Sequence, residues 1–240
     1  VTGEVSELDK QRVFFVTNYV ATEGSYDVTE GFIETVVPLA DGARFAKSLE
    51  LNAAVRRTNY STSGYVTTWK LGSTWRPTDD LLIRATRSRD IRAPNLNDLY
   101  NSGSTVNNRV SNPDTGTSVA YYGTTSGNIN LVPEEADSTG VGFVYQPGFL
   151  EGFSASVDYW NIDLNGAINS ISAQNIVDLC HQGGQTFCNA INEGQSFLSD
   201  SETNRIAIQP FNLAKQLVRG IDYEATYRRP MSMFTANWNG

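Results

Sequence analysis

Apolar and polar residues alternate along most of this 240-residue chain. In residues 45–57 the odd-numbered positions are mostly apolar and the even-numbered positions are mostly polar. Because successive side chains of a β-strand point to opposite faces, this pattern predicts a strand with one apolar and one polar face. The same alternation recurs in residues 33–39, 65–75, 81–88, 141–145, 153–159, 221–227 and 234–238. We therefore expect an all-β fold with about eight antiparallel strands.

Several of the predicted strands are unusually long. Strands in soluble proteins usually have ~5–6 residues. A strand that crosses a membrane needs ~9–11 residues because it is tilted. Residues 45–57 and 65–75 reach this second range. Strand length therefore favours a transmembrane β-barrel over a soluble β-sandwich.

Short and long connections alternate between the predicted strands. The short connections are polar turns at residues 38–43, 76–80, 146–152 and 228–231. The other connections are residues 59–64, 90–134 and 163–205, of which the last two are long. In an up-and-down meander, this alternation places the short turns at one end and the long loops at the other. That layout is typical of outer-membrane barrels with long extracellular loops.

Aromatic residues gather near both ends of the predicted strands. Near the short turns these are Phe45, Trp75, Tyr145, Phe149, Phe153, Tyr227 and Phe234, and near the other end they are Tyr60, Tyr65, Tyr159 and Trp160. Two such belts match the aromatic girdles of a membrane barrel. The alternative is that aromatic residues simply favour strands.

The polar face of each predicted strand must contact water. It carries Glu50, Asn52, Lys70, Arg84 and Asp158, among others. In a membrane barrel this face would line the lumen, and the apolar face would contact lipid. In a soluble β-sandwich or adhesin module the polar face would be outside. Alternation alone leaves both arrangements open.

Composition narrows the class of partner. The net charge is −8 and the isoelectric point is near 4.7. An acidic chain is a poor ligand for a nucleic-acid backbone, so we expect no nucleic-acid partner. No apolar run approaches the ~20 residues of a transmembrane helix. The polar first residues predict no signal peptide.

The two cysteines lie in the second long connection. Seven residues separate Cys180 from Cys188, and an exported loop would favour a disulfide between them. Residues 172–179 before them read as a short helix with Ser172 as its N-cap. The alternatives are a metal site that includes His181, which lacks the usual spacing, and two free thiols.

Nothing in the sequence resembles catalytic machinery. His181 is the only histidine, and no Ser and Asp arrangement around it suggests nucleophilic catalysis. We therefore expect neither an enzyme nor a cofactor or metal site. Loops on a rigid scaffold often carry recognition, so Arg109, Tyr121 and Tyr122 in the first long connection are the candidate ligand-binding residues.

Five segments, in order along the chain, resemble the barrel of TonB-dependent outer-membrane receptors. Residues 91–100, IRAPNLNDLY, resemble a stretch at the top of a barrel strand in that family. Residues 69–88 resemble its Lys-x-Gly-x-x-Trp-x-Pro strand and the strand that follows. The other similar segments are residues 25–41, 127–147 (GNINLVPEEA at its start) and 218–228 (VRGIDYEATYR).

The resemblance implies that the strands belong to a larger transmembrane barrel of about 22 strands. Residues 1–240 would then be a partial barrel domain that lacks the plug. Arg84, Arg87, Arg89 and Arg92 are expected to pair with Glu50, Asp90 or plug carboxylates, or alternatively to line the lumen or contact an anionic ligand.

The resemblance also implies a function and a location. The parent receptor would sit in the outer membrane of a Gram-negative bacterium, in contact with lipid, and would contact TonB through its plug. It would import a scarce solute, which could be an iron-siderophore, a vitamin, haem or a carbohydrate, and no residue selects among them. We expect a monomer. A passive porin-like channel is the alternative function.

Overall fold

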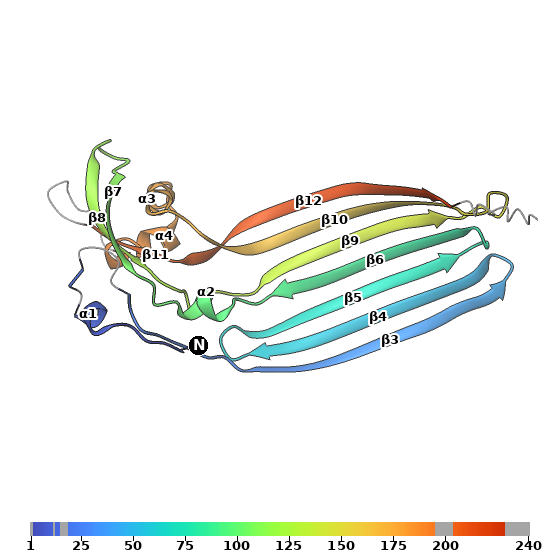
Figure 1. Cartoon of the computed structure of the whole chain (residues 1–240), viewed down its shortest axis with the longest axis horizontal. Coiled ribbons are helices and arrows are strands. Elements are labelled where there is room, and N and C mark those ends of the chain that lie inside the picture. Colours follow the sequence, from blue (N-terminus) through green and yellow to red (C-terminus); the bar gives the residue numbers. More distant parts are fainter. Residues whose placement is uncertain (1, 12, 15–18, 195–203, 229–240) are drawn as a thin grey trace, which may run out of the picture.

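Seven long antiparallel strands form one curved sheet (Figure 1). The computed structural model describes residues 2–11, 13–14, 19–194 and 204–228. The sheet order is β12-β10-β9-β6-β5-β4-β3. The strands are β3 (Val28–Ala43), β4 (Ala46–Tyr60), β5 (Gly64–Arg76), β6 (Leu81–Arg92), β9 (Glu134–Tyr145), β10 (Phe153–Ser170) and β12 (Pro210–Tyr227).

This architecture confirms the predicted all-β antiparallel meander. Each of the seven strands coincides with one of the predicted segments, although β4 begins one residue after the predicted segment 45–57. The eighth segment, residues 234–238, lies outside the described residues. No helix in the described part of the chain is long and apolar enough to span a membrane.

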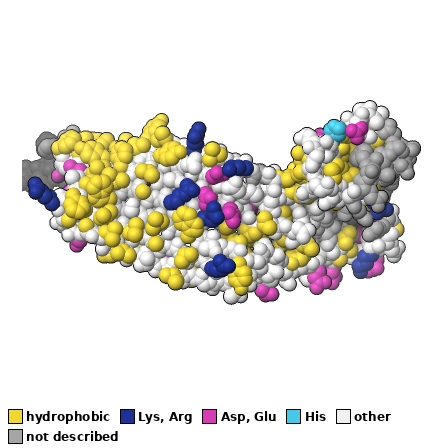
Figure 2. Space-filling model, turned by 180° about the vertical axis from the view of Figure 1, so that it is seen from behind, with side chains coloured by type: hydrophobic (Ala, Val, Ile, Leu, Met, Phe, Trp, Pro, Cys, Tyr) yellow, Lys and Arg dark blue, Asp and Glu magenta, His cyan; other side chains and the backbone are white. Residues whose placement is uncertain are grey.

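The strand register gathers the alternating apolar residues on one face of the sheet. One cross-strand row consists of Leu49, Trp75, Ile83, Phe143, Val157 and Tyr223. The next row includes Leu51, Val141, Tyr159 and Ile221. Tyr223 is 85% exposed and Ile221 is 63% exposed. Hydrophobic side chains crowd the short-turn end of this face (Figure 2), and no described element covers them.

The opposite face of the sheet is polar, and an ion pair on this face connects β6 to β10 across β9. Arg84 of β6 donates two hydrogen bonds to Asp158 of β10, at 2.8 and 2.6 Å. Gly142 of β9 lies between them in the register. A Cβ at Gly142 would lie 1.9 Å from the Asp158 carboxylate, so glycine makes room for the pair.

The prediction that the arginines of β6 pair with Glu50 or Asp90 was wrong. Arg84 pairs with Asp158, Arg89 with Asp137 and Glu135, and Arg92 with Glu134. These carboxylates lie on β9 and β10, which follow β6 only after a long connection. The alternation also places Arg87 and Arg89 on the apolar side of β6, away from Arg84.

The described parts of the two long connections fold together into what we call the loop subdomain, residues 105–125, 171–194 and 204–208. Its sheet has the order β11-β8-β7, formed by β7 (Thr105–Ser111), β8 (Ser118–Thr125) and β11 (Asn204–Ile208). β11 runs parallel to β8. Val119, Ile176 and Ile206 are almost completely buried between this sheet and the helices α3 (Ala173–His181) and α4 (Gln185–Asn189). The loops therefore share one hydrophobic core.

Besides helix α2, which follows β6, four smaller elements belong to the described chain. They are β1 (Thr2–Gly3), α1 (Glu7–Lys10), β2 (Thr22–Glu23) and the 3-10 helix η1 (Asn192–Gly194). β1 and β2 pair as a separate two-stranded sheet. All four lie toward the long-loop end of the molecule (Figure 1).

Helix α3 begins as predicted, at the Ser172 N-cap. The Ser172 hydroxyl accepts a hydrogen bond from the Asn175 backbone N–H at 3.2 Å. A disulfide joins Cys180, near the end of α3, to Cys188 in α4, with 4.7 Å between the Cα atoms. The chain reverses between them at Gly183, whose φ of 92° suits glycine. The disulfide thus holds the two helices together.

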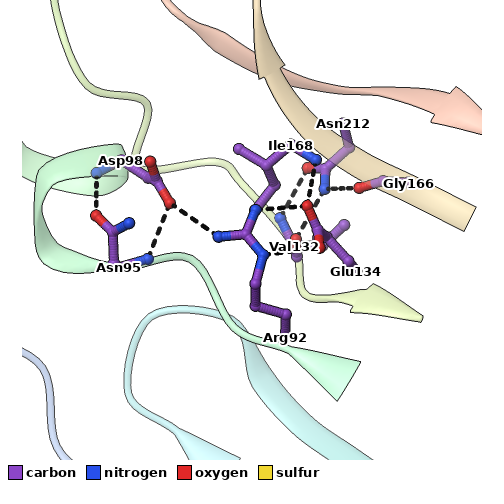
Figure 3. A network of polar contacts seen from close by, with 8 residues as sticks. All are labelled: Arg92, Asn95, Asp98, Val132, Glu134, Gly166, Ile168 and Asn212. Carbon is purple, nitrogen blue, oxygen red and sulfur yellow. Dashed lines mark hydrogen bonds and ion pairs between the residues drawn. The ribbon is translucent and has the colours of Figure 1, made fainter. Parts of the chain in front are cut away.

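A polar network, here called the Arg92 clamp, fixes the point where the sheet passes into the loop subdomain (Figure 3). Arg92 at the end of β6 donates to both carboxylate oxygens of Glu134 at the start of β9, at 2.8 and 2.5 Å. Glu134 is 7% exposed and also accepts from the Ile168 backbone N–H at 2.6 Å. One buried carboxylate therefore joins three strands.

The next residues after β6 extend the clamp. Helix α2 (Leu96–Tyr100) begins with a capping box, in which the Asn95 side chain and the Asp98 side chain each accept the other's backbone N–H, at 2.8 and 3.1 Å. The Asp98 carboxylate also lies 3.8 Å from the Arg92 guanidinium. The IRAPNLNDLY segment thus runs from the end of β6 into α2, and Asp98 of this helix lies back against the end of its own strand.

The GNINLVPEEA segment closes the clamp from the other side. A Cβ at Gly127 would lie 2.5 Å from the Leu99 carbonyl carbon, so this close approach requires glycine. Asn128 donates from its backbone to the Asp98 carbonyl at 2.8 Å and from its side chain to the Pro210 carbonyl at 2.9 Å. The segments IRAPNLNDLY and GNINLVPEEA, both of which resemble the family, therefore hold each other in place through these contacts.

The clamp generates a stability prediction. Replacing Glu134 with Gln should lower the free energy of unfolding of the protein by about 2 kcal/mol, because a buried carboxylate loses its ionic hydrogen bonds. Denaturant unfolding measures this change. The control is Glu135→Gln, since Glu135 is half-exposed and its pair with Arg89 spans 3.4 Å. Equal destabilisation by both variants would contradict the clamp.

The disulfide generates a second prediction. In the folded parent without reductant, neither Cys180 nor Cys188 should react with an alkylating reagent, and reduction should add two alkyl groups by mass spectrometry. Reduction should speed proteolysis of residues 171–208 alone, because the main sheet is held by its own hydrogen bonds. Alkylation of both cysteines in unreduced, folded protein would rule out the bridge.

Candidate functional site

The loop subdomain holds the three residues that the sequence nominated for ligand contact, but on two different faces. Tyr121 of β8 points into the core and is only 6% exposed. Burial raises the pKa of its phenol above the ordinary value. Tyr121 therefore contributes to packing, and a ligand would have to open the core to reach it.

Arg109 and Tyr122 lie on the opposite face of the same small sheet. Tyr122 pairs with Asn107 of β7, and Arg109 is two residues further along that strand, so the side chains project to the same side. Arg109 is exposed, and its Nε donates to the Ser118 hydroxyl at 3.0 Å. A second guanidinium nitrogen donates to the Ser118 carbonyl. These two bonds hold the Arg109 guanidinium against Ser118 at the start of β8.

The parallel strand β11 adds a residue that sequence reasoning missed. Arg205 pairs with Tyr122 in the register and is exposed. We refer to Arg109, Tyr122 and Arg205 as the basic face. Arg205 belongs to the second long connection and Tyr122 to the first, so no sequence pattern signals their approach. The face combines two cationic donors with an aromatic ring.

A groove of about 660 Å³ lies beside the core, between α4, β11 and the start of β12. Phe187 and Phe211 contribute aromatic surface, with ring centroids 5.4 Å apart. Amide side chains also line it, namely Asn128, Asn130, Asn189, Gln209 and Asn212. Three of these already form hydrogen bonds within the protein. Asn212 donates to the Val132 and Gly166 carbonyls, Asn128 donates to the Pro210 carbonyl, and Asn189 accepts from the Gln185 side chain. The groove can bind a solute through amide hydrogen bonds and ring contacts.

The elements β7, β8, β11 and α4, which carry most of these two surfaces, lie together at the long-loop end of the molecule (Figure 1). The described residues contain no cluster of three or more His, Cys, Asp and Glu side chains suited to a metal ion. The basic face and the groove offer charge, hydrogen-bonding groups and aromatic rings to a ligand.

Solved structures of receptors have a similar fold. The siderophore receptor PirA from Acinetobacter baumannii matches 83% of this chain with a TM-score of 0.57 and 15% identity. A double mutant of the ferric enterobactin receptor PfeA from Pseudomonas aeruginosa matches 86% with a TM-score of 0.60 and 20% identity. The hemophore receptor HasR from Serratia marcescens, solved with its hemophore HasA and heme, matches 85% with a TM-score of 0.52 and 16% identity.

These likenesses extend over only part of each receptor. The chain covers 25% of PirA, 25% of PfeA and 32% of HasR. Because the sequence identities are only 15–20%, these likenesses establish the fold alone. No curated protein matches the chain.

The family itself is established by a sequence model. The model described as TonB dependent receptor-like, beta-barrel, matches residues 9–240, which is nearly the whole chain. The match includes the sheet, the Arg92 clamp and the loop subdomain. The chain therefore belongs to the TonB-dependent receptor family, within its β-barrel.

Proposed function

We propose that this chain is part of an outer-membrane receptor that imports a scarce solute with energy delivered through TonB. The observation that carries the proposal is the continuous apolar face that seven strands share. Such a face needs a non-aqueous neighbour, and the lipid of the outer membrane supplies one. The polar face, with Arg84 and Asp158, would then line the lumen.

This orientation assigns a role to each end of the molecule. The loop subdomain would face the outside, where solute arrives, and the short turns would face the periplasm. The Arg92 clamp would hold the loop subdomain at a fixed position over the lumen. TonB would act through the plug of the parent receptor, and the receptor would work as a monomer.

The basic face favours an anionic, aromatic solute. Arg109 and Arg205 can form charge-assisted hydrogen bonds, and Tyr122 between them offers a ring. A ferric siderophore of the catecholate type has this chemistry, and PirA and PfeA are siderophore receptors by name. We therefore place an iron-siderophore ahead of a vitamin, haem or a carbohydrate as the solute.

Uptake by the full-length parent tests this function. The parent would be expressed in a strain that lacks its own siderophore receptors, with and without TonB. We expect TonB-dependent accumulation of radiolabelled iron supplied as ferric enterobactin. The same assay would be run with haem, cyanocobalamin and a maltooligosaccharide. Equal uptake without TonB would instead indicate a passive porin-like channel.

The basic face predicts the effect of a double substitution. Arg109→Ala combined with Arg205→Ala should weaken ferric enterobactin binding by about tenfold, because two charge-assisted contacts are lost. The matched control, Arg44→Ala combined with Arg76→Ala, removes two arginines near the short-turn end. Equilibrium binding to cells measures both. Unchanged binding in the first variant would reject the basic face as the solute site.

A further inference from the structure

The groove beside α4 contains polar side chains that no other described residue uses. Asn130, Gln209 and Thr186 all line this groove of about 660 Å³. Among the described residues, none of these three side chains forms a hydrogen bond within the protein. Asn130 and Thr186 are exposed, and Gln209 is half-buried. Two amides and a hydroxyl are therefore available to a ligand.

The lining of this groove favours a neutral ligand over a charged one. Among the described residues that line it, none is charged, so an ionic group of a ligand would lose water without gaining a partner. Side-chain amides donate and accept hydrogen bonds at once, as the hydroxyls of a sugar do. Phe187 adds an aromatic ring that can contact the apolar face of a sugar. A neutral, hydroxyl-rich group therefore matches the lining.

The walls of the groove are held in place by contacts within the protein. The Asn212 side chain donates to the Val132 and Gly166 carbonyls at 2.8 and 2.7 Å. The Ala207 backbone N–H of β11 donates to the Ala190 carbonyl after α4 at 2.8 Å, and the disulfide ties α4 to α3. A ligand then finds the groove already formed, which lowers the entropy cost of binding. The volume also falls within the ~300–1,000 Å³ of ligand pockets.

The groove adjoins the basic face along strand β11. Ala207, which lines the groove, lies two residues after Arg205 of the basic face. Side chains two residues apart on a strand project to the same side, about 7 Å from each other. Tyr122 pairs with Arg205 in the register, so the aromatic ring is on this side as well. One solute can therefore contact the cationic surface and the uncharged groove together.

We propose that the groove binds a sugar carried by the same solute whose anionic, aromatic part lies on the basic face. The receptor would then select a glycosylated solute, with charge recognised by Arg109 and Arg205 and sugar hydroxyls recognised by Asn130 and Gln209. The inference rests on the proposed function, because it concerns the solute that the basic face would hold. It adds a second contact surface of different chemistry to that site.

The experiment measures equilibrium binding to cells that express the full-length parent. The two probes are ferric enterobactin and ferric enterobactin with glucose attached to its catechol rings. The wild type should bind the glucosylated compound about tenfold more tightly, because the sugar adds hydrogen bonds. Asn130→Ala combined with Gln209→Ala should remove this difference. Arg109→Ala combined with Arg205→Ala should weaken the binding of both compounds by the same factor, since both carry the anionic part.

The matched control removes the same two residue types from another surface of the loop subdomain. Asn175→Ala combined with Gln182→Ala changes two exposed residues in and directly after α3, neither of which lines the groove. This variant should keep the preference for the glucosylated compound.

Several outcomes would overturn the proposal. They are equal binding of both compounds by the wild type, equal weakening of both in the Asn130 and Gln209 variant, and loss of the preference in the control variant. Displacement of the glucosylated compound by an equal concentration of free maltooligosaccharide would also overturn it, because the groove would then be a separate carbohydrate site. A preserved preference without TonB-dependent uptake of iron would instead overturn the proposed function.

Discussion

A single constraint organises this molecule: seven strands expose one apolar face that the described chain itself does not cover. Side chains such as Tyr223, Ile221 and Tyr65 remain more than half exposed. Removing apolar surface from water contributes about 25 cal/mol per Å², so a large uncovered sheet face would be costly in solution. Lipid on this face and water on the other resolve the conflict. The sheet can then be long and thin because it needs no second layer.

The same constraint explains why the small hydrophobic core is found in the loops. The main sheet meets solvent or lipid on its two faces, so its strands contribute little to a conventional interior. The loop subdomain, by contrast, buries Val119, Ile176 and Ile206 between a small sheet and two helices. The Arg92 clamp joins the two parts with an ion pair between the half-exposed Arg92 and the buried Glu134, and with a capped helix. The clamp thus fixes the loop subdomain at the end of the main sheet.

The strands could be predicted from the sequence because alternation is a local property. Residues 45–57 alone reveal their two faces, and the N-cap at Ser172 was equally visible. Partners across long connections were not visible, which is why Arg84 was assigned to Glu50 or Asp90 and not to Asp158. The three-stranded loop sheet was missed for the same reason. Once residues 118–125 are known to form a strand, alternation already implies that Tyr121 and Tyr122 face opposite ways.

The central claim is that the odd-numbered positions 49–55 of β4 lie on the face toward lipid and the even-numbered positions 50–56 lie on the face toward a wet lumen. Single cysteines at positions 49 to 56 of the full-length parent, with a spin label on each, test it directly in reconstituted bilayers. We expect labels at 49, 51, 53 and 55 to be accessible to dissolved oxygen and shielded from a water-soluble nickel reagent. Labels at 50, 52, 54 and 56 should show the reverse. Equal accessibility at both sets, or an inverted pattern, would contradict the account.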